Sequence, residues 1–321
     1  MTTNTPLTTN TPPRIVGIGE LLWDMLPPPA GRQLGGAVAN FCYHCRALGA
    51  RATLISAVGR DPLGRELIAK LQSLKLNADN IQLYDRQPTG TVTVKLEGGQ
   101  PHYDIHQPVA WDFIKSTPAI MALAEQADAV CFGTLAQRCD ASRQTIRRVL
   151  GSTRPETLRI FDVNFRQNFA TDTIVTESLA LANVLKLNDE ELPILAKYLG
   201  LKAPPAAAPA ASSEEQAFFK QLAERFGLRL IALTRGHGGS TLWALEGGKL
   251  THSYCPPETI EVVDTVGAGD AFTAGLVVGM LAGRDLPTIH RQASRLASYV
   301  CTRAGATPEY DAALLDYLKT V

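Results

Sequence analysis

The chain has 321 residues, of which 45% are hydrophobic, so it can bury a sizeable core in one large domain or two. Its 31 basic and 31 acidic residues balance and no basic cluster stands out, which argues against nucleic acid as a partner. No apolar run is long enough to span a bilayer, and the first residues lack both a basic start and an apolar stretch. We therefore expect a cytoplasmic protein with no signal peptide and no membrane partner.

Residues 1–13 are polar and Pro-containing, and the segment 2–6 recurs as 8–12. We predict that these residues are a disordered tail and that a single domain covers 14–321. Within that domain the pattern predicts strands at 14–19, 52–58, 129–132, 158–162, 182–187 and 228–234, and helices at 62–74, 142–150, 189–199, 268–282, 287–304 and 311–319. This alternation predicts an α/β fold, with a mostly parallel sheet that helices cover on both faces.

Three segments depart from the alternation of strands and helices. Residues 21–34 are Pro-rich, and 89–105 alternate Thr and Val as in a hairpin that turns at Gly98 and Gly99. Together they predict a small β-lid, formed by about 21–36 and 88–110, over the carboxyl ends of the main strands. Residues 202–213 are rich in Ala and Pro and predict a flexible surface loop between two helices.

The segment 264–272 reads Asp-Thr-Val-Gly-Ala-Gly-Asp-Ala-Phe and precedes an apolar helix. Free N–H groups and the positive end of the helix dipole meet at such a start, which favours a bound anion. Asp270 places a carboxylate there. It can cap the helix, or it can take a proton from a hydroxyl that attacks a phosphate held by the amides of Gly267, Ala268 and Gly269.

Further polar motifs follow the predicted strands, where ligands bind in open α/β sheets. Two glycines, Gly35 and Gly36, open the helix that contains Asn40. The other motifs are Asp-Val-Asn-Phe-Arg at 162–166, Lys-Leu-Asn-Asp-Glu-Glu at 186–191 and Thr-Arg-Gly-His-Gly-Gly at 234–239. Arg166 is a candidate for neutralising phosphate, and a structural ion pair explains it equally well. The last motif is also compatible with an ordinary hairpin.

Residues 264–272 resemble the C-terminal signature of the ribokinase-like (PfkB) sugar kinase family, and 35–40 resemble its N-terminal signature. The three motifs just named match the family in order between them, and the resemblance covers roughly 14–319. It implies a ribokinase-like three-layer fold with a lid over the sugar, which in the family sometimes forms a homodimer contact. It also implies ATP, magnesium and potassium as cofactors.

The resemblance assigns roles residue by residue. Asp270 is implied as the base, with Gly267, Ala268 and Gly269 as the anion hole. Sugar binding is implied for Asp24, Gly35, Gly36, Asn40, Tyr103, Gln107 and Arg166. ATP binding is implied for Asn188, Thr234, Gly236, Gly239, Gly267 and Gly269. Asn188 and Glu191 would organise magnesium through water, and backbone carbonyls near Asp264, Val266, Val300, Arg303 and Gly305 would hold potassium. Glu309 stands where the family has a small hydroxyl or amide side chain, so potassium activation stays open.

The residues at 19–24, 162–166 and 186–191 look closer to bacterial fructokinases than to ribokinases. Kinases of 2-keto-3-deoxygluconate place an Arg on the second lid strand, whereas 103–107 here read Tyr-Asp-Ile-His-Gln. A neutral sugar is therefore expected, with fructose first. Ribose, 2-keto-3-deoxygluconate or a nucleoside as acceptor, and a sugar sensor without catalysis, remain alternatives.

The six cysteines include a Cys-x-x-Cys pair, Cys42 and Cys45. No second ligand pair accompanies them, so we expect reduced thiols packed in the interior, and neither zinc nor redox chemistry.

Overall fold

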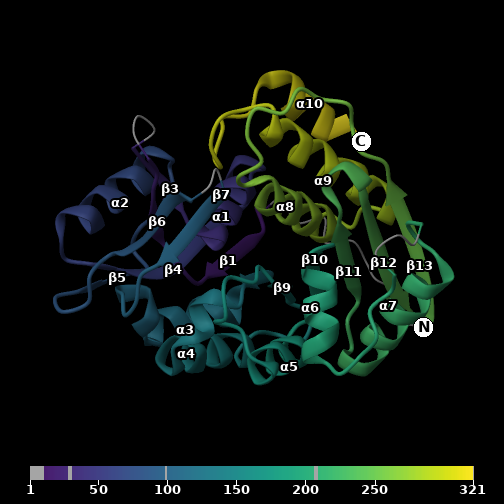
Figure 1. Ribbon diagram of the computed structural model, residues 1–321, viewed down its shortest axis with the longest axis horizontal. Helices are drawn as coiled ribbons and strands as arrows, with labels where there is room; N and C mark the ends of the chain where they lie inside the picture. Colours follow the sequence, from purple (N-terminus) through teal and green to yellow (C-terminus); the bar gives the residue numbers. More distant parts are fainter. Residues whose placement is uncertain (1–10, 28–30, 98–99, 206–208, 321) are drawn as a thin grey trace.

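The computed structural model describes residues 11–27, 31–97, 100–205 and 209–320. Its centre is a nine-stranded sheet in the order β13-β12-β11-β10-β9-β8-β1-β4-β5 (Figure 1). The strands are β1 (Arg14–Ile18), β4 (Arg51–Gly59), β5 (Ile81–Tyr84), β8 (Ala129–Phe132), β9 (Leu158–Asp162), β10 (Val184–Asn188), β11 (Leu230–Thr234), β12 (Ser240–Glu246) and β13 (Lys249–Cys255). All neighbours pair in parallel except β11 with β12 and β12 with β13. The predicted mostly parallel sheet is confirmed.

Ten helices are described: α1 (Ala37–Ala47), α2 (Pro62–Ser73), α3 (Pro118–Gln126), α4 (Asp140–Gly151), α5 (Asp172–Leu181), α6 (Glu191–Tyr198), α7 (Ser213–Phe226), α8 (Ala268–Leu281), α9 (Leu286–Cys301) and α10 (Ala312–Thr320). Figure 1 shows α3 to α7 along one side of the large sheet and α1, α8, α9 and α10 along the other.

Alternation along the strands explains the two helical layers. Val130 and Phe132 of β8 pack into the core on the side of α3 to α7, whereas Ala129 and Cys131 pack into the core on the side of α1, α2, α8 and α9. Successive strand residues point to opposite faces, so a strand that is apolar throughout needs cover on both. All four residues of β8 are buried. The α/β three-layer architecture follows directly.

A second, smaller sheet has the order β3-β2-β6-β7. Its strands are β2 (Leu22–Met25), β3 (Arg32–Gly35), β6 (Gly90–Glu97) and β7 (Gln100–Ile105). The strands β6 and β7 pair antiparallel as the predicted hairpin, and β2 joins them through β6. The predicted turn at Gly98 and Gly99 lies outside the described residues.

Several boundaries differ from the sequence predictions. The helix predicted at 189–199 begins at Glu191, and the one predicted at 287–304 ends at Cys301. The sequence patterns also missed α3, α5 and the antiparallel pair β12–β13, and they gave no bounds for the helix expected after the Ala/Pro-rich stretch, which is α7. The Ala/Pro-rich stretch lies between α6 and α7 as expected, although 206–208 are outside the described residues.

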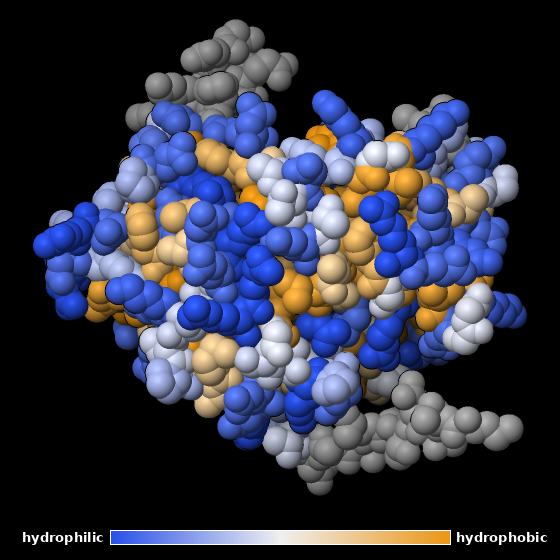
Figure 2. All heavy atoms as spheres, turned by 90° about the horizontal axis from the view of Figure 1, so that it is seen from below, coloured by the Kyte–Doolittle hydropathy of each residue, from blue (hydrophilic) through white to orange (hydrophobic). Residues whose placement is uncertain are grey.

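The N-terminal tail is described only from Thr11, and 1–10 lie outside the described residues. The carbonyl of Pro13 already accepts a hydrogen bond from the Arg51 amide. None of the described helices is long and apolar enough to cross a bilayer. On the face shown in Figure 2, hydrophobic patches are interrupted by charged and polar side chains.

The cysteines are free thiols, and Cys42, Cys45 and Cys131 are buried. Burial raises the pKa of Cys42 to about 12, which keeps the thiol protonated and unreactive. Among the described residues, no cluster of three His, Cys, Asp or Glu side chains could hold a metal ion. Cys42 and Cys45 are thus packed in the interior on α1, as expected.

Candidate active site

The turn before α8 presents a set of unpaired backbone donors. Gly267 adopts φ +82°, and a Cβ there would lie 2.6–2.8 Å from atoms of Ala306, so only glycine fits. The Ala268 amide donates to the Thr265 carbonyl at 3.3 Å, whereas the amides of Gly267, Gly269 and Asp270 find no acceptor among the described residues. Three free N–H groups at the positive end of a helix suit a phosphate.

Asp270 lies beside these amides and is held by a residue distant in sequence. The Asn40 side-chain amide donates to Asp270 Oδ2 at 2.9 Å. Burial and the nearby carboxylate of Asp162 raise the pKa of Asp270 to about 7, against the lowering effects of Asn40, Lys186 and Arg166. A carboxylate that titrates near neutral pH is suited to accept a proton.

Glycines bring the start of α1 against the small sheet. Gly35 of β3 lies beside Asp24 of β2, and a Cβ on Gly35 would come within 2.5 Å of Asp24 Oδ2. Gly36 adopts φ +115°, and its Cβ would lie 2.5 Å from the Glu20 carbonyl. Gly36 therefore excludes any side chain, a side chain on Gly35 would displace Asp24, and the predicted group of Asp24, Gly35, Gly36 and Asn40 is assembled at one place.

Several oxygen atoms in this region lack donors. The Asp24 carboxylate accepts no hydrogen bond from the described residues, and burial raises its pKa to about 6 against the effect of Arg166. Oδ1 of Asn40 is buried without a partner. A ligand that donates several hydrogen bonds would satisfy these acceptors.

Glu20 belongs to this region and was missed by the sequence analysis. It is 3% exposed; Oε1 accepts the Ala37 amide at 3.2 Å, and Oε2 is buried without a partner. Burial raises the pKa of Glu20, while Arg166 lowers it. The signal in the sequence was a lone charge inside the apolar run at 18–23.

Arg166 is an exposed cation on the loop after β9. Its charge lowers the pKa values of Glu20, Asp24 and Asp270, and it forms no ion pair with a described residue. Gln107 is exposed and precedes a cis peptide to Pro108. The side chain of Tyr103, on β7, lies outside the described residues.

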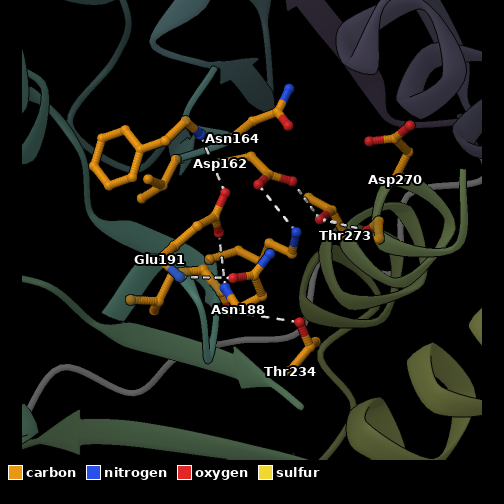
Figure 3. A network of polar contacts seen from close by, with 12 residues as sticks. Asp162, Asn164, Asn188, Glu191, Thr234, Asp270 and Thr273 are labelled. Carbon is orange, nitrogen blue, oxygen red and sulfur yellow. Dashed lines mark hydrogen bonds and ion pairs between the residues drawn. The ribbon is translucent and has the colours of Figure 1, made fainter. Parts of the chain in front are cut away.

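A buried polar network lies beside the first turns of α8 (Figure 3). Asp162, at the end of β9, accepts from Lys186 Nζ at 3.1 Å, and its other oxygen lies 3.0 Å from the Thr273 hydroxyl. That hydroxyl is also 3.0 Å from the Gly269 carbonyl and can donate to either oxygen. Burial lowers the pKa of Lys186, but the carboxylates of Asp162, Glu191 and Asp270 outweigh it and raise the pKa. The ammonium therefore stays charged.

Asn188 and Glu191 bind each other's backbone. Asn188 Oδ1 accepts the Glu191 amide, and Glu191 Oε2 accepts the Asn188 amide, both at 2.8 Å (Figure 3). Glu191 Oε1 accepts the Phe165 amide at 3.2 Å. Each oxygen keeps one further lone pair. The pair can therefore still accept hydrogen bonds, for example from waters bound to magnesium.

The turn at 234–239 joins β11 to antiparallel β12. Gly236 adopts φ +50° and Gly239 φ +76°, which glycine allows. Arg235 binds Glu215 and Thr241 at 2.6 and 2.8 Å and is structural. Thr234, the last residue of β11, pairs with Asn188, the last residue of β10. These two predicted residues therefore lie side by side at the carboxyl ends of neighbouring strands.

The residues expected around potassium come from two adjacent segments. Asp264 joins them, because Oδ1 accepts the Val266 amide and Oδ2 accepts the Gly305 amide, both at 3.0 Å. The Val300 carbonyl accepts the Arg303 amide at 3.0 Å. The segments 264–266 and 300–305 therefore meet beside the Gly267 turn, and their backbone carbonyls are the oxygen type that binds such a cation.

Comparison with known proteins identifies similar sugar kinases. An uncharacterized sugar kinase of Pyrococcus horikoshii is 30% identical over 316 residues, which are 92% of this chain and 93% of its own. Its structure in complex with ATP gives a TM-score of 0.74 at 28% identity, covering 91% of this chain and 94% of that one.

Fructokinases are also similar to the chain. The enzyme of Salmonella typhimurium is 32% identical over 283 residues, which are 84% of this chain and 85% of its own. The fructokinase of Vibrio cholerae O395, in its fructose, ADP and calcium bound form, has a TM-score of 0.77 at 21% identity and covers 95% of this chain and 98% of that one, which shows a shared fold. The family model described as pfkB family carbohydrate kinase matches residues 26–313. The chain therefore belongs to the pfkB family of carbohydrate kinases.

Proposed function

We propose that this sugar kinase transfers the terminal phosphoryl group of ATP to a hydroxyl of a neutral sugar, with fructose as the first candidate and fructose 6-phosphate as its product. The observation that carries the proposal is the surplus of hydrogen-bond acceptors beside Asp270. Asp24, Glu20 Oε2 and Asn40 Oδ1 lack donors among the described residues. A sugar supplies hydroxyl donors at several positions, and fewer hydroxyls would leave buried acceptors unpaired.

Charge favours a neutral acceptor over an anionic one. Glu20, Asp24 and Asp270 are three carboxyl groups in this region, and Arg166 is the cation that acts on all of them. A carboxylate or phosphate on the acceptor would face those acids. Similarity to fructokinases supports fructose, whereas ribose, 2-keto-3-deoxygluconate and nucleosides stay as alternatives of the same reaction class.

The proposed roles follow the positions of the side chains. Asp24 and Asn40 bind sugar hydroxyls, and Gly35 and Gly36 let the sugar approach the backbone; Tyr103 and Gln107 belong to the proposed lid. Asp270 takes the proton of the attacking hydroxyl. The amides of Gly267, Gly269 and Asp270 stabilise the negative charge on the transferring group. Arg166 holds the acceptor and the phosphoryl group in line.

Bound ATP would supply the phosphoryl group, and bound magnesium would neutralise part of its charge. Asn188 and Glu191 would orient the waters of that magnesium, and Thr234, Gly236 and Gly239 would line the nucleotide. Backbone carbonyls of Asp264, Val266, Val300, Arg303 and Gly305 would hold potassium. We further propose a cytoplasmic enzyme, and a homodimer formed through the small sheet.

A sugar panel tests the proposal. The purified chain is incubated with ATP, magnesium and fructose, ribose, glucose, 2-keto-3-deoxygluconate or adenosine, and ADP release is followed in a coupled assay, with and without potassium. Fructose is expected to give the highest kcat/KM. If another acceptor exceeds it by about tenfold or more, the fructose assignment is wrong while phosphoryl transfer stands. Binding of sugar without any ADP release would instead support a non-catalytic sensor.

A further inference from the structure

Lys186 is a buried cation for which the proposed reaction gives no role. Its side chain is 9% exposed, and Nζ lies 3.1 Å from Asp162 Oδ1. An ammonium has three N–H donors, and Asp162 is its one acceptor among the described residues. Two donors are therefore left in a place almost closed to bulk water, which is unfavourable unless a second acceptor arrives.

The Lys186 ammonium lies against the first turn of α8. A Cβ placed on Gly269 would be 3.1 Å from Nζ, so the ammonium and the unpaired Gly269 amide are neighbours. Thr273, one turn further along α8, binds the other oxygen of Asp162 and closes the network. The N-terminus of a helix carries a partial positive charge, so the ammonium and the start of α8 together favour an anion at this point in addition to the Asp162 carboxylate.

We propose that Lys186 is a phosphate-binding residue, whose remaining N–H groups bind the terminal phosphate of the nucleoside triphosphate from the sheet side of the anion hole. This inference rests on the proposed function and adds to it the full positive charge that backbone amides lack. Arg166 is exposed and lowers the pKa values of Glu20, Asp24 and Asp270, whereas Lys186 is buried directly against Gly269.

The competing explanation is that Lys186 only neutralises Asp162. Three variants separate the two: Lys186→Met, Asp162→Asn and the double variant that carries both. In the double variant the buried pair is replaced by two neutral side chains of similar size, so the fold is kept even where Lys186→Met alone, with an unpaired buried carboxylate, is unstable. Lys197→Met is the control, because Lys197 is an exposed lysine on the adjacent helix α6.

Isothermal titration with a non-hydrolysable ATP analogue and with ADP gives the decisive comparison, because only the analogue carries the terminal phosphate. We expect the double variant to bind the analogue at least about tenfold more weakly than wild type, with ADP affinity changed by less than about threefold. We also expect its kcat to fall by about 10²-fold. Unchanged affinity for the analogue in a folded double variant, with kcat near wild type, overturns the inference. Failure of the proposed function looks different: the wild type would bind the analogue and phosphorylate no acceptor.

Discussion

Asn40 and Asp270 are joined by a hydrogen bond of 2.9 Å although 230 positions separate them in the sequence. Asn40 lies on α1, the helix that follows the small sheet, and Asp270 lies in the first turn of α8. The bond brings the proposed acceptor side and the anion-binding turn into one site. It also favours the charged form of Asp270, since the amide donates to a carboxylate oxygen.

Replacing Asp270 tests its role as base. We expect Asp270→Asn to lower kcat by about 10²–10⁴-fold, because the carboxamide cannot take the proton, while sugar affinity changes only a few-fold. Steady-state kinetics and sugar titration measure both quantities. Asp140→Asn, which alters an exposed carboxylate in α4, is the control and should retain full activity. More than a tenth of wild-type turnover in Asp270→Asn would remove Asp270 from the mechanism.

The pH dependence of kcat/KM should follow the ionisation of Asp270. Its pKa lies near 7 in the free protein, and the reaction needs the ionised form, so kcat/KM should rise with pH through about 7 and then level off. Removing the Asn40 donor in Asn40→Ala should shift this limb to higher pH, because the charged form loses a hydrogen bond. Profiles of kcat/KM between pH 5 and 9 measure the limb. A profile that is flat from pH 6 to 8 contradicts this assignment.

Gly267 and Gly247 offer a matched pair of glycines. Both have positive φ, but a Cβ on Gly267 would collide with Ala306, whereas a Cβ on Gly247, in the turn between β12 and β13, meets nothing within 4 Å. Gly247→Ala should cost about 1 kcal/mol of stability and keep activity. Gly267→Ala should nearly abolish turnover, because the turn that holds the free amides must move. Equal activity in the two variants would show that the turn tolerates a side chain.

His44 links α1 to the segment behind that turn. Nε2 lies 3.0 Å from the Ala306 carbonyl and must donate, so Nδ1 accepts from the Tyr310 hydroxyl at 2.6 Å. His44→Leu leaves the Ala306 carbonyl without this donor, and we expect a loss of about 1–3 kcal/mol in the free energy of unfolding at pH 8. Urea unfolding measures it.

Lowering the pH should reduce the stability difference between wild type and His44→Leu. Burial lowers the pKa of His44 to about 4, below the 6.5 of the free side chain, so His44 weakens the folded state as pH falls from about 6.5 toward 4. The leucine variant has no imidazole to protonate, so its folded state is not weakened in this way. The stability gap between wild type and His44→Leu should therefore narrow over that range. A gap that widens with acid would mean that the folded protein prefers charged His44.

The Ala/Pro-rich loop should be dispensable within limits set by α7. Ser212 caps α7 by accepting the Glu215 amide at 3.3 Å, so a shortened loop has to keep it. Replacing 203–209 by a short Gly/Ser linker, or removing 1–10, should leave kcat and KM unchanged, because neither segment carries a predicted site residue. A well-folded variant with a large loss of kcat would show that one of them acts in the reaction.

The sequence predicted the glycine motifs of the site better than the bounds of the helices around them. Gly36 and Gly267 are recognisable because positive φ and close backbone contact leave glycine as the residue that fits, and such needs are visible in a short pattern. Periodicity placed α8 within one residue of its C-terminal end, because that helix is apolar throughout. For α7 it gave only the existence of a helix after the Ala/Pro-rich loop, without its bounds.

Glu20 and Lys186 were missed in the sequence for the same physical reason. Glu20 and Lys186 look like ordinary charges in sequence, and only burial makes them informative. Lys186 acquires its place from Asp162 on the neighbouring strand and from Gly269 on α8, neither of which local spacing reveals. Asn188 and Glu191 were found by pattern, but their hydrogen bonds to each other's amides required coordinates.

Helix α1 contacts both the proposed sugar site and the segment behind the anion-binding turn. Its first turns face the acceptor side through Asn40, and one turn later His44 and Tyr43 hold the carbonyls of Ala306 and Pro308 beside the phosphate turn. Because the proposed sugar and nucleotide sites meet at this helix, any coupling that it carries between the two ligands is reciprocal. The factor by which bound sugar tightens the nucleotide must then equal the factor by which bound nucleotide tightens the sugar.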